Sequence, residues 1–356
     1  MAIVTLINKN NLPYKVSEVF IWNQYKGTTS FNFILSKTIV LMLFFSFLYF
    51  PIIAQTKSDK IDTTESNQYL SLAEDAYNAG ETDKAKNYLL KSLELNPKNI
   101  HSYSALSYIT YLEENHKETI KYASRGLKVF DKDKLPKDEV YLDLIKLKAY
   151  SLVFLEEYLE ALPYLSEAIE MNKEDHYNHY QRAVAYMKIG DLETAYNDIK
   201  KAYQLKPGEP GVNTVFGRIL YEMDEYSNAL TYLHKSNKLL QSTGTGKQEN
   251  PLNYYYLGAS YYYLKEYDKS IKNLQTHLNH PIQIFRNSIY EMKATLHLGF
   301  AYFQKEEYDN AIPYLKKIVE FDSLHTKASY KYAFSLMATG DLMKAQPLLE
   351  EYCRFR

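Results

Sequence analysis

A pattern of small and aromatic residues recurs about every 34 residues from Ser66 onward and constrains the fold more than any other feature. In residues 66–99, Tyr69 stands at position 4, Ala73 at 8, Gly80 at 15, Ala85 at 20 and Pro97 at 32. Aligning the chain on positions 8 and 20 gives seven further small pairs: Ser107/Thr119, Ala149/Ala161, Ala183/Ala195, Gly217/Ala229, Gly258/Ser270, Gly299/Ala311 and Ala333/Ala345. Apolar residues spaced three and four apart predict two amphipathic helices in each copy. Repetition at a fixed period indicates a stacked array.

These marks resemble the tetratricopeptide repeat. The resemblance implies an all-α, right-handed superhelical solenoid of about eight helix-turn-helix repeats, at residues 66–99, 100–133, 142–175, 176–209, 210–243, 251–284, 292–325 and 326–356. In this family, positions 8 and 20 face each other where the paired helices cross, so only a small residue fits. Each hairpin buries its apolar face against the next. We therefore expect Gly258 and Gly299 at tight helix crossings.

Three short segments interrupt the strict tandem arrangement: residues 134–141, 244–250 and 285–291. Seven or eight residues make about two helical turns, so the first and third insertions are expected to lengthen the first helix of their repeats. The second insertion contains Gly244 and Gly246 and precedes Pro251, which predicts a loop.

The N-terminal part contains an apolar run at residues 38–54, preceded by Lys37 and interrupted by Pro51. This is typical of a secretory signal peptide cleaved before Gln55, and it predicts export from a bacterial cytoplasm to the periplasm or cell envelope. The alternative is a signal anchor that keeps the protein in the membrane. Residues 1–37 are an extension that a mis-called start or a cytoplasmic tail would explain, and residues 55–65 are expected to be a flexible linker.

Composition and motifs argue against catalysis, cofactors and nucleic acid. The formal net charge is −1, which gives no electrostatic footprint for nucleic acid. Cys353 is the only cysteine and lacks zinc-site spacing. Residues 241–248 (QSTGTGKQ) lack the first glycine and the hydroxyl of a phosphate-binding loop. The pairs His176/His179 and His277/His280 are interpreted as structural. We predict a non-enzymatic chain with no cofactor, no metal and no evident small-molecule substrate.

The 36 tyrosines are the main anomaly of composition. The family resemblance implies that positions 2, 5, 6, 9, 12 and 13 of the first helices line a concave groove. Tyrosine is favoured in recognition surfaces because it gives a large contact area at low entropy cost. We expect Tyr256 and Tyr263 to be solvent-accessible at the centre of the site, and Tyr254 and Tyr261 to be in the core. The predicted partner-binding residues are Tyr108, Tyr111, Tyr150, Tyr177, Tyr180, Tyr255, Tyr256, Tyr262, Tyr263, Phe300, Phe303, Tyr330 and Phe334.

One groove known in the family clamps a C-terminal carboxylate. Lys327 and Lys331 match the lysines of its third repeat, but Tyr255, Ala259 and Phe300 replace the polar residues of the first two. We therefore expect no such clamp. The sequence predicts a protein- or peptide-binding scaffold of the cell envelope, acting in complex assembly or secretion. A sensory or regulatory module of a longer receptor is the first alternative, and an enzyme within the helical array is the second.

Overall fold

The computed structural model describes residues 63–130, 138–242, 250–280, 289–322 and 325–354. These residues form sixteen α-helices and no strand, which confirms the all-α prediction. None of the helices in this part of the chain is long and apolar enough to cross a membrane. The expectations for residues 1–37, 38–54 and 55–62, for the loop at 244–249 and for residues 134–137 and 285–288 of the other two insertions fall outside the described residues. Residues 63–65, predicted to belong to the linker, are instead the start of the first helix, which begins at Thr63.

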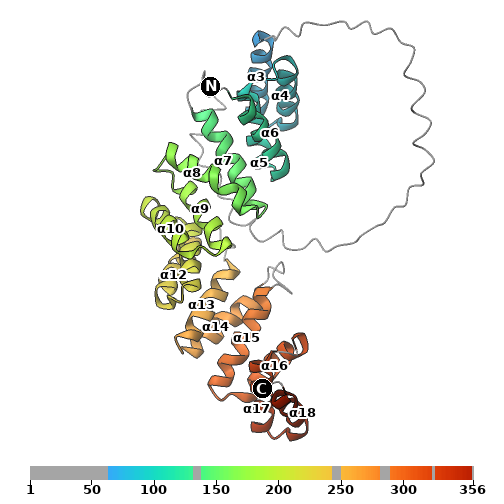
Figure 1. The fold of residues 1–356 in the computed structure, drawn as a ribbon, viewed down its shortest axis with the longest axis vertical. Coiled ribbons are helices and arrows are strands. Elements are labelled where there is room, and N and C mark those ends of the chain that lie inside the picture. The colour runs from blue at the N-terminus through green and yellow to red at the C-terminus, as the bar shows by residue number, and fades with distance from the viewer. Residues whose placement is uncertain (1–62, 131–137, 243–249, 281–288, 323–324, 355–356) are drawn as a thin grey trace, which may run out of the picture. The chain divides into compact units, whose positions relative to one another are not determined.

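The helices follow one another along the chain as eight hairpins (Figure 1). In chain order they are α3 (Thr63–Asn78), α4 (Thr82–Leu95), α5 (Ile100–Leu112), α6 (His116–Val129), α7 (Glu139–Phe154), α8 (Tyr158–Met171), α9 (His176–Ile189), α10 (Leu192–Leu205), α11 (Pro210–Glu222), α12 (Tyr226–Ser242), α13 (Pro251–Tyr263), α14 (Tyr267–Leu278), α15 (Ile289–Gln304), α16 (Tyr308–Phe321), α17 (Thr326–Ala338) and α18 (Leu342–Arg354). The chain divides into two compact units, residues 1–151 and 152–356, and each is described by itself.

The turn inside each hairpin contains one residue in the left-handed region of backbone space. Three of these residues are glycines, with φ of 79° to 92°, and five are not, with φ of 59° to 64°. All eight stand at position 15 of the 34-residue frame: Gly80, Glu114, Glu156, Gly190, Asp224, Lys265, Glu306 and Gly340. Left-handed geometry commonly ends a helix and suits glycine best. The periodic turn is therefore a backbone feature that the array keeps even where glycine is absent.

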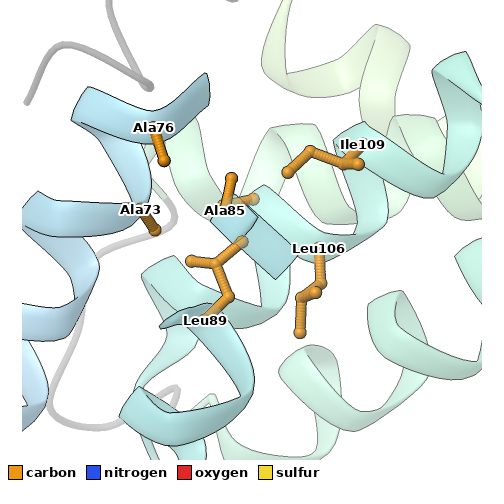
Figure 2. Close-up of a cluster of buried hydrophobic side chains, with 7 residues drawn as sticks. Ala73, Ala76, Ala85, Leu89, Leu106 and Ile109 are labelled. Carbon is orange, nitrogen blue, oxygen red and sulfur yellow. The ribbon is translucent and has the colours of Figure 1, made fainter. Parts of the chain in front are cut away.

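The two helices of a hairpin cross where both carry a small residue. Ala73 of α3 and Ala85 of α4 are fully buried, and Leu89 and Leu106 pack beside them (Figure 2). At the equivalent place in α13, a Cβ added to Gly258 would lie 2.6 Å from Leu274 Cγ and 3.0 Å from the backbone nitrogen of Leu274. The prediction that Gly258 sits at a tight crossing is confirmed.

The first helices of successive repeats contact one another as well as their own partners. In the second unit α9 contacts α11, α11 contacts α13, α13 contacts α15, and α15 contacts α17. Side chains on these helices therefore adjoin across repeats and can form one continuous surface. The helix α15 begins at Ile289 and holds 16 residues, against 13 in α11, α13 and α17, so residues upstream of the 34-residue frame join this surface.

Candidate partner-binding surface

Five of the aromatic residues predicted for the groove are buried within the chain. Tyr108, Tyr111 and Tyr150 belong to the first unit, where the rings of Tyr111 and Tyr150 lie 6.4 Å apart. Burial raises the pKa of Tyr108 to about 12. Tyr255 and Tyr256 belong to the second unit and are each only 2% exposed.

The prediction that Tyr256 is solvent-accessible is wrong. Its ring centroid lies 5.2 Å from that of Tyr221 in the preceding repeat and 6.0 Å from that of Tyr290 in the following one. Its hydroxyl donates a hydrogen bond to the hydroxyl of Tyr290 over 3.3 Å, and burial raises its pKa. Neighbouring repeats cover this position, so the residue acts in packing between repeats.

Tyr263 is exposed as predicted, at 46% of its surface. Its ring stacks on Tyr226 with 4.5 Å between centroids and 7° between planes. Tyr262, its neighbour, is partly buried and contacts the ring of Phe300 at 6.5 Å. The ring of His297 lies 5.3 Å from Tyr262 and 5.7 Å from Tyr263, so it joins the two.

The aromatic contacts continue onto α15 and α17. Phe303 meets Phe334 at 5.6 Å, and Phe334 meets Tyr330 at 6.2 Å. Tyr330 is 40% exposed. The ammonium of Lys331 lies 3.8 Å from the ring centroid of Phe303, and burial lowers its pKa. We call Tyr262, Tyr263, Phe300, Phe303, Tyr330 and Phe334 the aromatic face.

The remaining predicted pair, Tyr177 and Tyr180, lies on α9. Their rings are stacked with 5.6 Å between centroids, and both are partly buried. Burial raises the pKa of Tyr180 to about 12. The second unit therefore holds these two tyrosines, the buried pair Tyr255 and Tyr256, and the aromatic face.

Sequence reasoning missed a charged residue among these rings, Arg218 of α11. Its guanidinium carbon lies 5.3 Å from the ring centroid of Tyr256. Arg218 and Tyr221 occupy positions 9 and 12 of their repeat, which are groove positions of the family, so the position in the repeat is the signal that identifies them. Tyr290 lies two residues upstream of its repeat's frame, where that rule gave no signal.

Two of the histidines interpreted as structural, His179 and His277, contact neighbouring protein atoms. His179 is buried, with Nδ1 3.3 Å from a carboxylate oxygen of Asp198 and Nε2 3.1 Å from the carbonyl of Lys173. Arg182 binds the same carboxylate through two nitrogens, at 2.7 and 2.8 Å. The Nδ1 of His277 lies 2.8 Å from the carbonyl of Pro251. These contacts support the interpretation of His179 and His277 as packing residues.

Comparison with known proteins agrees with the geometry of the hairpins. Two family models described as tetratricopeptide repeats match residues 146–210 and, for the second model, residues 69–99 and 293–323. A TPR repeat-containing protein of Methanocaldococcus jannaschii is 26% identical over 195 residues, which is 52% of this chain and 33% of that protein. The chain thus spans about a third of the length of the curated relative it matches.

Solved structures give weaker likenesses. PilW, a type IV pilus biogenesis factor, is 14% identical with a TM-score of 0.48 over 61% of this chain and 94% of its own. The pilF protein of Pseudomonas aeruginosa is 18% identical with a TM-score of 0.47, over 68% of this chain and 97% of its own. The family models, the sequence relative and the helical hairpins together show that the chain contains tetratricopeptide repeats.

Proposed function

We propose that the protein is a non-catalytic scaffold of the cell envelope that binds a protein or peptide segment along its first helices and acts in complex assembly or secretion. The observation that supports this most is the aromatic face. Soluble proteins keep scattered apolar residues on their surfaces, but contiguous groups of them mark interaction sites. Here six aromatic side chains from α13, α15 and α17 form two groups that Lys331 joins by lying over both Phe300 and Phe303. Two of the six, Tyr263 and Tyr330, keep 40% or more of their surface in solvent.

Energetics explains how such a face would bind. Tyrosine and phenylalanine contribute strongly to interfaces because they bury a large area with few rotatable bonds. The rings of the aromatic face are already held by neighbours, as Tyr263 is held by its stacking on Tyr226. Little side-chain entropy is therefore lost when a partner covers them.

Site-specific photo-crosslinking tests this proposal. A photoreactive phenylalanine analogue replaces Tyr263 or Tyr330 in the full chain produced in its native host. Leu159 and Met343, which lie on the second helices α8 and α18 and are 73% and 90% exposed, are the matched controls. We expect one protein to crosslink from both tyrosine positions and not from the controls. Equal crosslinking from all four positions would contradict the proposal.

Export is a separate part of the proposal, supported by the apolar run at residues 38–54. We expect N-terminal sequencing of protein recovered from the envelope fraction to begin at or within two residues of Gln55. A full-length species that resists carbonate extraction would instead indicate a membrane anchor. Protein found only in the cytoplasmic fraction would refute an envelope function without bearing on the aromatic face.

A further inference from the structure

Arg218 has no counter-charge among the described residues. It projects from α11 with part of its surface open to solvent, while its Nε is buried and has no hydrogen-bond acceptor. No carboxylate in the described parts of the chain forms an ion pair with it, in contrast to Arg182, which grips Asp198. A cation taken partly out of water without a partner lowers stability. Such a residue therefore calls for an explanation beyond packing.

Four tyrosines interact with the guanidinium of Arg218. The guanidinium of Arg218 lies over the ring of Tyr256, and the hydroxyl of Tyr256 interacts with it. Tyr180 and Tyr290 are close enough to interact with it electrostatically, and so is Tyr158, whose buried hydroxyl has no hydrogen-bond partner within the described residues. We call Arg218, Tyr158, Tyr180, Tyr256 and Tyr290 the arginine cluster. It offers one cation and several O–H groups, and a phenol is neutral at pH 7.

Positive charges act on Tyr290 of the cluster. Although burial acts to raise the pKa of Tyr290, the charge of Arg218, a hydrogen bond from Tyr256 and the charges of Lys188 and Lys293 together lower it. Three acids lie in the surroundings, since Glu222 acts on Tyr256, Glu209 acts on Tyr180 and Glu156 acts on Tyr158. None of the three forms an ion pair with Arg218.

A carboxylate fits this chemistry. The planar guanidinium presents N–H groups in a fork that matches the two oxygens of a carboxylate. One partly buried cation balances one negative charge, and phenol O–H groups can donate to the same oxygens. A phosphate at neutral pH carries close to two charges and would need a second cation inside the cluster, whereas Lys188 and Lys293 are exposed.

We infer that the arginine cluster is a binding site for a carboxylate carried by the protein segment that occupies the aromatic face. The inference rests on the proposed function and names the chemistry of the partner. The two surfaces are continuous, because Tyr221 contacts Tyr256 at 5.2 Å and Tyr263 at 6.3 Å. A segment lying on Tyr263 can therefore place an acidic group on Arg218.

Nuclear magnetic resonance of the Arg218 Nε–H group in the full chain tests the site directly. Since Nε has no acceptor in the free protein, a bound carboxylate should move its signal downfield in a saturable way. The probes are N-acetyl-glutamate amide, which has a side-chain carboxylate, N-acetyl-alanine, which has a terminal one, and N-acetyl-glutamine amide as the uncharged control. We expect one or both acids to shift the signal and the control to leave it unchanged. No saturable shift with either acid, or a shift with inorganic phosphate alone, would overturn the inference.

The Arg218→Met variant separates a binding role from a packing role. If Arg218 serves a ligand, removing an uncompensated charge should leave the melting temperature equal or higher. A fall of more than about 5 °C would show that Arg218 stabilises the fold and would count against the inference. Peptides selected from a random library on the wild-type chain provide the final comparison.

Some selected peptides should bind the Tyr263→Ala variant more weakly than the wild type. For these peptides we expect Arg218→Met to lower the affinity at least tenfold. Removing the carboxylate of the peptide, by Asp→Asn, by Glu→Gln or by amidation of its C-terminus, should lower the affinity for the wild type equally. The loss of affinity caused by Arg218→Met and the loss caused by these peptide changes should not add when the two are combined. Loss with Tyr263→Ala but none with Arg218→Met would refute the carboxylate site and leave the proposed function standing. Peptides indifferent to Tyr263→Ala would count against the proposed function itself.

Discussion

Replacing Gly258 by alanine tests whether the repeat register places the helix crossing where the structure has it. The added Cβ would lie 2.6 Å from Leu274 Cγ, 2.9 Å from Cδ2 and 3.0 Å from the Leu274 backbone nitrogen. Leu274 is fully buried, and its backbone nitrogen moves only if α14 moves. The variant Gly258→Ala therefore overpacks the crossing, which costs about 1–3 kcal/mol.

Two other glycines set the scale. Alanine is better than glycine in a helix by about 1 kcal/mol, so the net loss for Gly258→Ala is about 0–2 kcal/mol. At Gly299 the nearest atom to an added Cβ is Leu315 Cδ2 at 3.0 Å, the end of a side chain. Gly299→Ala should thus be at least about 1 kcal/mol less costly than Gly258→Ala. Gly208 lies in a turn with open space around it, and Gly208→Ala is the unclashed control.

The assay must resolve individual repeats, because the stability of a stacked array is close to a sum of local terms. Hydrogen exchange in the full chain does so. We expect Gly258→Ala to speed exchange first in α13 and α14, Gly299→Ala to leave α15 and α16 almost unchanged, and Gly208→Ala to slow exchange or have no effect. If α13 in the Gly258→Ala variant is as well protected from hydrogen exchange as α15 in the Gly299→Ala variant, the assigned crossing is wrong. The larger variant Gly258→Leu should show the same order with a greater loss.

Two further predictions concern charge and backbone. Burial raises the pKa of Asp143 to about 7 from 3.8, so the folded state holds its proton more tightly, and the first unit should lose up to about 4 kcal/mol of stability as pH rises from 4 to 7. Burial also lowers the pKa of His116 to about 4, which makes the first unit more stable as pH rises over part of this range and so acts against the Asp143 effect. The measurement is therefore the difference in unfolding free energy between wild type and Asp143→Asn, taken from urea unfolding at each pH. A difference that does not change with pH would contradict the prediction. Lys265 has φ of 64°, so Lys265→Gly should stabilise its hairpin by about 0.5–1 kcal/mol. Gly190 has φ of 89°, so Gly190→Ala should destabilise its hairpin by about 1 kcal/mol. Thermal melts in which both variants shift the melting temperature in the same direction would refute the strain argument.

The hairpins could be predicted from sequence because their determinants are local. A small residue at positions 8 and 20 of each repeat permits a crossing whatever the neighbouring repeats contain. The pairs of seven repeats sit on helices that pack against each other, as Ala73 and Ala85 do. The turn was less visible. Gly80, Gly190 and Gly340 mark it, but Glu114 and Lys265 adopt the same left-handed backbone without a glycine signal.

Exposure was harder to predict, because it depends on what adjacent repeats place over a position. A position in the frame indicates which face of the helix a side chain occupies and says nothing about the length of the next helix. Tyr256 and Tyr263 lie two turns apart on one helix, yet one is 2% and the other 46% exposed. The single-repeat rule treated them alike.

The difference between these two tyrosines follows from the insertion before α15. Because α15 begins at Ile289, Tyr290 reaches beyond the frame of its repeat and places its ring 5.3 Å from Tyr255 and 6.0 Å from Tyr256. The aromatic pair at the start of α13 is thereby converted from groove lining into packing between repeats. The same residue interacts electrostatically with Arg218. A lengthened helix can thus close part of a groove and complete a polar site within it, which no repeat considered alone could reveal.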